Sequence, residues 1–101
     1  MTNNGIEIMR QNDGVLFGSA KYFAIRAHGA VPGQKMRIYD VVSHSQQESL
    51  AKILWWGRWR QYIIEPRPGT IWSADCLACI QIFIERLMKD WRESKGHVAN
   101  E

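Results

Sequence analysis

The sequence predicts an α+β fold in which a three- or four-stranded antiparallel sheet packs on one C-terminal α-helix. Three consecutive segments rich in β-branched and aromatic residues are separated by short polar turns, as in sequential antiparallel strands. A longer segment follows them, with apolar residues spaced three and four apart, which is typical of an amphipathic helix. The chain has 101 residues, enough for one hydrophobic core and too few for two.

Composition and charge are those of an ordinary globular protein. Hydrophobic residues make up 46% and charged residues 23% of the chain, and 13 Lys and Arg against 10 Asp and Glu leave a net charge of +3. This small excess permits a nucleic-acid partner without requiring one. The sequence shows neither a secretion signal nor an apolar stretch near the roughly 20 residues of a membrane span. We therefore expect a cytoplasmic protein with no membrane partner.

Both polar ends of the chain are expected to lie outside the folded domain. They contain few periodic apolar positions, so we predict a disordered N-terminal tail over residues 1–14, a single α+β domain over 15–92 and a frayed C-terminal tail over 93–101. Within the domain, residues 22–27 are compatible with a short extra strand, and Pro32-Gly33 predicts a turn.

The three main strands are predicted over residues 37–43, 49–56 and 59–65. A two-residue Gly57-Arg58 turn of type II′ is expected between the last two strands, because glycine adopts a positive φ without a Cβ clash. This turn places Trp56 opposite Trp59. Pairing residue 43 with residue 49 sets the register of the first two strands.

This register gives the sheet one apolar face and one mixed face. The apolar face is expected to hold three rows: Val41, Ala51 and Ile64; Tyr39, Ile53 and Tyr62; Arg37, Trp55 and Arg60. The mixed face is expected to hold Ile38, Asp40, Val42, Leu50, Lys52, Leu54, Gln61, Ile63 and Glu65, with Trp56 and Trp59 at its tip. The apolar face should meet the helix. The mixed face needs a cover, for which residues 22–25 and a second copy of the chain are the two candidates.

The helix is predicted from Ser73 to about Arg92. Ser73 suits the N-cap, and Asp75 suits the positive end of the helix dipole. The apolar stripe of the helix is expected to contain Leu77, Ile80, Ile84, Leu87, Met88 and Trp91, flanked by Cys76 and Phe83.

Cys76 and Cys79 form a C-x-x-C pair in this helix, a spacing that also occurs in zinc and redox sites. Zinc needs two further ligands, and the three histidines, His28, His44 and His97, are scattered along the chain. A redox pair needs a thioredoxin-like βαβ setting, which sequential strands do not offer. We predict reduced structural thiols, with no metal and no cofactor.

The sequence contains no recognisable catalytic set. Gly-rich phosphate loops, H-E-x-x-H and G-x-S-x-G are absent. A hydrolase triad would have to come from one strand and its turn, namely Asp40, Ser43, His44 and Ser45. Asp40 and Glu65 flank Lys52 on the mixed face, which indicates a solvated charge row. We therefore expect a protein that is not an enzyme and has no catalytic residues.

The hairpin tip is the remaining candidate for a functional site. Residues 55–62 hold three of the five tryptophans of the chain together with two arginines. Such residues are typical of protein interfaces, and they also suit stacking on bases with phosphate contacts. The third interpretation is structural, in which these side chains only stabilise the hairpin and cap the core.

The predicted register divides the tip into two parts. Trp55 faces the helix, whereas Trp56, Arg58 and Trp59 lie on the other side and are the candidate partner-binding residues. We expect a small non-enzymatic binding module that acts through a protein partner or self-association. Nucleic-acid binding through the same tip is the alternative, and a net charge of only +3 makes it the second choice.

Residues 55–77 read W-W-G-R-W-R-Q-Y-I-I-E-P-R-P-G-T-I-W-S-A-D-C-L. This stretch resembles a pattern in short uncharacterised proteins of bacteria and their phages, in which a W-x-G-x-W-R-Q-Y hairpin precedes a P-x-P-G-T link and a C-L helix. The resemblance implies a β-hairpin followed by a helix, and a location in bacterial or phage cytoplasm. It implies no activity and no functional residue.

Overall fold

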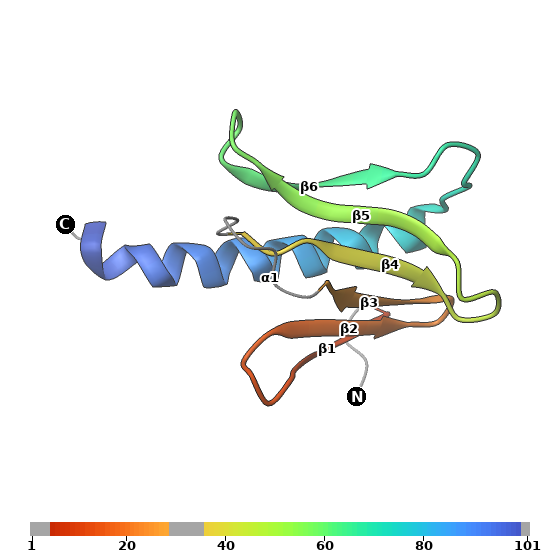
Figure 1. The fold of residues 1–101 in the computed structure, drawn as a ribbon, viewed down its shortest axis with the longest axis horizontal. Coiled ribbons are helices and arrows are strands. Elements are labelled where there is room, and N and C mark those ends of the chain that lie inside the picture. The colour runs from red at the N-terminus through yellow and green to blue at the C-terminus, as the bar shows by residue number, and fades with distance from the viewer. Residues whose placement is uncertain (1–4, 29–35, 100–101) are drawn as a thin grey trace.

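The computed structural model describes residues 5–28 and 36–99, which form a six-stranded antiparallel sheet and one helix (Figure 1). The strands follow one another in chain order and are β1 (Ile6–Arg10), β2 (Leu16–Ala20), β3 (Phe23–Ala27), β4 (Tyr39–Ser43), β5 (Ser49–Trp56) and β6 (Gln61–Pro66). The helix α1 (Ala74–Ala99) packs on one face of the sheet. The α+β antiparallel class is confirmed, whereas the predicted count of three or four strands is too low.

The N-terminal segment forms the first hairpin of the sheet. β1 pairs with β2 along its whole length, from Ile6 opposite Ala20 to Arg10 opposite Leu16. The side chain of Ile6 is 1% exposed. Residues 6–10 are therefore part of the domain and not of a disordered tail, because pairing with β2 and burial under the helix order a segment whose own apolar pattern is short.

β3 confirms the short strand that residues 22–27 allow. It pairs with β4 from Phe23 opposite Ser43 to Ala27 opposite Tyr39. It therefore widens the sheet and does not cover the mixed face. The turn predicted at Pro32-Gly33 lies outside the described residues.

The register between β4 and β5 is largely as predicted. Tyr39 pairs with Ile53 and Val41 pairs with Ala51, but a bulge after Val41 brings Ser49 opposite Val42. The predicted pairing of residue 49 with residue 43 is therefore wrong by one position.

The tip of the β5–β6 hairpin is longer than the predicted two-residue turn. Trp56 pairs with Gln61, so residues 57–60 form a four-residue loop. The positive φ in this loop, 55°, belongs to Arg60 and not to Gly57, and the Arg60 N–H donates to the Gly57 carbonyl at 3.2 Å. The pairing moves by two residues, which is an even number, so each strand side chain keeps its predicted face.

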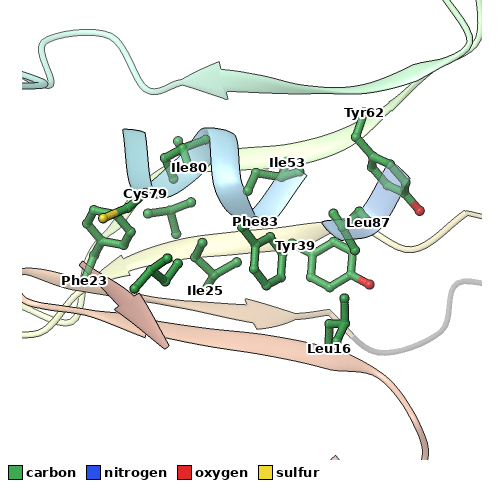
Figure 2. Close-up of a cluster of buried hydrophobic side chains, with 13 residues drawn as sticks. Leu16, Phe23, Ile25, Tyr39, Ile53, Tyr62, Cys79, Ile80, Phe83 and Leu87 are labelled. Carbon is green, nitrogen blue, oxygen red and sulfur yellow. The ribbon is translucent and has the colours of Figure 1, made fainter. Parts of the chain in front are cut away.

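The hydrophobic core lies between the helix and the predicted apolar face of the sheet (Figure 2). It contains Ile6, Leu16, Phe23, Ile25, Tyr39, Val41, Ala51, Ile53, Tyr62, Cys79, Ile80, Phe83 and Leu87. Phe83 is 0% exposed, and its ring centroid lies 5.4 Å from that of Tyr39 in an edge-to-face arrangement. A Cβ on Gly18 of β2 would lie 3.3 Å from the Phe83 ring, so glycine lets the helix approach the sheet closely.

The buried stripe of the helix differs from the predicted one at its N-terminal end. Leu77, expected in the core, is 47% exposed, whereas Cys79 and Phe83 are 7% and 0% exposed. The sequence predicts that Phe83 flanks the apolar stripe of the helix. It lies at the centre of the buried stripe instead, because the space above Gly18 accepts its ring. The stripe therefore turns towards Cys79 and Phe83, which moves Leu77 into solvent.

The helix begins where the sequence predicts and ends later. The Cys76 N–H donates to Ser73 Oγ at 3.1 Å, so Ser73 is the N-cap. The helix continues to Ala99, past the predicted end at Arg92, and most of the expected frayed tail is therefore helical. No helix among residues 5–28 and 36–99 is long and apolar enough to cross a membrane.

Two buried tyrosines make the stability of this core sensitive to high pH. Burial raises the pKa of Tyr39 from 10.0 to about 12 and also raises the pKa of Tyr62. The folded state thus favours the neutral phenols, so their contribution to stability is complete below pH 10 and is lost as the pH rises towards 12. We expect Tyr39→Phe to lose less stability than the wild type between pH 10 and 12 in urea titrations.

The matched control for this experiment is Tyr22→Phe, because Tyr22 is 62% exposed. Its stability should follow the wild-type pH profile. A Tyr39→Phe profile parallel to that of the wild type would show that the Tyr39 phenol does not carry this pH dependence.

Candidate partner-binding surface at the hairpin tip

The three candidate residues Trp56, Arg58 and Trp59 lie together at the tip of the β5–β6 hairpin. The exposed fractions of Trp56 and Trp59 are 42% and 63%, and Arg58 is also exposed. The two indole rings contact each other, with centroids 6.2 Å apart and an interplanar angle of 63°. We call these three residues the tip surface. The rings of the tip surface are already held against each other, which reduces the side-chain entropy that a partner would have to restrict.

The third tryptophan of the hairpin has a different environment. Trp55 packs on Tyr62 and on Trp91 of the helix, with ring centroids 5.4 and 5.0 Å away. The Arg60 guanidinium lies over the Trp91 ring at 5.9 Å. Arg37, predicted to share a row with Trp55, donates to the His28 carbonyl at 3.0 Å. Trp55 and Trp91 therefore fasten the hairpin to the helix, as predicted for Trp55.

The face of the sheet opposite the helix, which is the predicted mixed face, is not covered by any described helix or loop (Figure 1). The charge row predicted on this face is present and has a fourth member. The strand register pairs Arg26 with Asp40, Asp40 with Lys52, and Lys52 with Glu65. The charges alternate in sign from β3 to β6, so this face has little net charge.

Apolar residues lie on both sides of this charge row. Leu54 pairs with Ile63 between the row and the tip surface, and both side chains are half-buried. Ala24 pairs with Val42 on the far side of the row. The uncovered face therefore combines apolar area with charges of both signs.

A second exposed apolar area lies at the opposite end of the molecule. Tyr22 and Ile71 are 62% and 95% exposed. Tyr22 and Ile71 line a cavity of about 540 Å³ between the strand turns and the link to the helix. Sequence reasoning missed this area, because single apolar residues in turns have no periodicity that would separate exposed from buried ones.

The residues considered for a hydrolase triad do not assemble into one. Asp40 accepts a hydrogen bond from Ser49 Oγ at 2.6 Å. The His44 ring instead lies 2.9 Å from the Ala20 carbonyl, and Ser43 Oγ lies 3.2 Å from Ser45 Oγ. The His44 ring thus contacts a backbone carbonyl, Asp40 binds a serine outside the set, and the two serines bind each other.

Cys76 and Cys79 of the helix do not form a disulfide. Cys79 is 7% exposed and belongs to the core, and burial raises the pKa of its thiol. This environment fits the predicted structural role. His28 lies 3.5 Å from Asp40, and the His97 side chain lies outside the described part of the structure. The described residues contain no group of three or more His, Cys, Asp or Glu that could hold a metal ion.

These features define an α+β protein with a six-stranded antiparallel sheet, one face of which is covered by a helix and the other by no element of the described ranges 5–28 and 36–99. Comparison of the chain with protein-family models, curated proteins and solved structures finds no match. The resemblance of residues 55–77 implies a β-hairpin followed by a helix, and the structure contains both, as β5, β6 and α1. The bacterial or phage origin that the resemblance implies stays a prediction.

Proposed function

We propose that this protein is a small non-enzymatic binding module of bacterial or phage cytoplasm that recognises a protein partner through its tip surface. The observation that carries this proposal is the pair of exposed, mutually contacting rings of Trp56 and Trp59 beside the exposed Arg58. Tryptophan and arginine dominate the residues that contribute most to protein interfaces. Trp55 and Trp91 already fasten the hairpin to the helix, so a structural role does not require the outer pair.

The open sheet face next to the tip surface favours a protein over a nucleic acid. Leu54 and Ile63 extend the apolar area of the tip, and the charges beyond them alternate in sign. A protein surface can match both signs. A phosphate backbone would meet Asp40 and Glu65 as well as Arg26 and Lys52, which weakens its attraction.

Nucleic acid remains the second candidate because the exposed Arg58 directly precedes the exposed ring of Trp59, as in surfaces that stack on bases. We expect no saturable change in tryptophan fluorescence when mixed-sequence single-stranded DNA or RNA is added at low salt, where phosphate contacts are strongest. Saturable binding that weakens with salt and is lost in Arg58→Ala would assign the tip surface to nucleic acid instead.

Site-specific crosslinking in bacterial cells tests the protein partner. A photoreactive amino acid at position 59 should give one discrete crosslinked protein, and the same amino acid at position 71 should not. Ile71 is a suitable control position, because it is the more exposed apolar site, at 95%, and lies at the other end of the molecule.

The purified partner then permits a quantitative test. Trp59→Ala is expected to weaken its binding by about 30-fold, the effect of losing about 2 kcal/mol at a central interface residue. Ile71→Ala should bind like the wild type. If Trp59→Ala and Arg58→Ala both bind like the wild type while their thermal stability falls, the tip surface is structural and the proposal is lost.

A further inference from the structure

The two edges of the sheet differ in how they are protected. At the β6 edge the Tyr62 N–H donates to Met88 Sδ of the helix at 3.4 Å. Pro66, two positions beyond Ile64 on the same edge, has no N–H to offer. Proline and occupied backbone donors are devices that prevent further strands from pairing with an edge. The β6 edge is therefore protected.

Among the described residues, nothing gives the β1 edge this protection. Gln11 N–H donates to the Val15 carbonyl at 2.8 Å, and hydrogen bonds of an antiparallel pair recur at every second residue. Glu7 and Met9 thus direct their backbone groups towards β2. Those of Ile6, Ile8 and Arg10 point outwards. β1 contains no proline, and its register with β2 has no bulge. It can accept another strand.

A groove of about 480 Å³ lies along this edge, between β1 and the helix. Ile6 and Ile8 of β1 and Ile82 of the helix line its apolar part. Arg10 extends to Asp90 of the helix, with 3.0 Å between the guanidinium and the carboxylate. An added strand could therefore bury its alternate side chains in this groove while its backbone pairs with β1.

We propose that the strand that fills this groove is β1 of a second copy of the chain. A twofold axis perpendicular to the sheet at Ile8 would place the two β1 strands antiparallel, with Ile8 opposite its own copy, and join both sheets into one. Each copy offers the same outward backbone groups to the other. The interface is isologous, as in most homodimers.

The charges along the helix edge support a second copy over an unrelated peptide. Glu85, Arg86 and Lys89 border the groove, and Glu85 and Lys89 are four residues apart, about one helical turn. Within one chain Glu85 accepts a hydrogen bond from Gln81 Nε2 at 3.1 Å and Lys89 lies 3.6 Å from Glu93. The same twofold axis makes the two helices antiparallel, so that in the proposed dimer Glu85 of each copy can exchange its present partner for Lys89 of the other. A helix edge carrying both signs in this order is complementary to itself.

Light scattering coupled to size-exclusion chromatography tests this proposal. The wild type should have the mass of two 11.7 kDa chains. Ile8→Lys should have the mass of one chain, because a lysine charge on an edge strand prevents pairing. The matched control is Ile64→Lys on the protected β6 edge, where the residue is also half-buried and also belongs to an edge strand. This variant should remain dimeric.

A monomeric wild type, a dimeric Ile8→Lys or a monomeric Ile64→Lys would each overturn the proposal.

If circular dichroism shows that Ile8→Lys or Ile64→Lys does not fold, charge reversal on the helix tests the proposed dimer instead. Glu85→Lys and Lys89→Glu should each weaken the dimer, and the double variant should restore it. A double variant no tighter than the singles would also overturn the proposal. Trp59→Ala should leave the dimer mass unchanged, so this outcome is independent of the proposed function.

Discussion

Replacing Phe83 with alanine should lower the free energy of unfolding by about 3–5 kcal/mol, the usual cost of removing a buried aromatic ring. Phe83 is 0% exposed, its ring lies against Tyr39, and Gly18 leaves the space that it fills. The surrounding strands are paired on both sides, so they cannot collapse into the cavity. Denaturant unfolding followed by circular dichroism measures this effect.

Leu77→Ala is the control for this substitution, because Leu77 lies on the same helix and is predicted from the apolar spacing to be buried. It is 47% exposed, and we expect its truncation to change the free energy of unfolding by no more than about 0.5 kcal/mol. Equal costs for Leu77→Ala and Phe83→Ala would contradict the helix orientation described above.

Ile6→Ala should have the second largest effect, a loss of about 2–5 kcal/mol. Ile6 is 1% exposed and belongs to the core formed with the helix, although it lies in a segment that the sequence places in a disordered tail. The same substitution at Ile71, which is 95% exposed, should be neutral within about 0.5 kcal/mol. An Ile6→Ala variant as stable as the wild type would show that β1 does not contribute to the folded domain.

The elements that the sequence predicts well are those whose signal is local. β5 has eight residues, of which Ile53, Trp55 and Trp56 favour strands, and the helix repeats its apolar residues over several turns. The signal of the first hairpin is short, because β1 has only two β-branched residues, Ile6 and Ile8. β2 reads Leu16-Phe17-Gly18-Ser19-Ala20, without a β-branched aliphatic residue. It forms a strand because β1, β3 and the helix pack around it, and a local pattern does not contain that information.

At the hairpin tip, the predicted turn between β5 and β6 is incorrect, but the predicted sheet face of each tryptophan in β5 is correct. A non-glycine residue with positive φ is uncommon, so sequence reasoning favours Gly57 for that role. The structure instead uses Arg60, and the loop gains two residues. Side chains alternate along a strand, so the two-residue change leaves Trp55 on the helix side and Trp56 on the open side. The candidate site was predictable for this reason.

The orientation of the helix could not be predicted with the same accuracy. Leu77 and Phe83 both lie within the span of apolar residues, and their periodicity allows either to be central. The choice depends on Gly18, more than fifty positions away in the chain. The exposure of Leu77 follows from that distant contact.

The proposed function depends on how the five tryptophans are divided between the core and the surface. Trp55 and Trp91 pack on each other, and Trp72 packs on Phe23 and donates to Thr70 Oγ1 at 2.8 Å. Trp56 and Trp59 are left on the surface. Three tryptophans thus build the fold, and two are available to a partner.

Fluorine NMR of 5-fluorotryptophan protein in the presence of a soluble paramagnetic agent tests this division most directly. The agent should broaden the resonances of Trp59 and Trp56 most strongly, and those of Trp55, Trp72 and Trp91 much less. The measurement is then repeated in the presence of the partner protein identified by crosslinking at position 59. In this complex, only Trp56 and Trp59 should become protected from the agent. Equal broadening of all five resonances, or protection confined to Trp55, Trp72 or Trp91, would contradict the account.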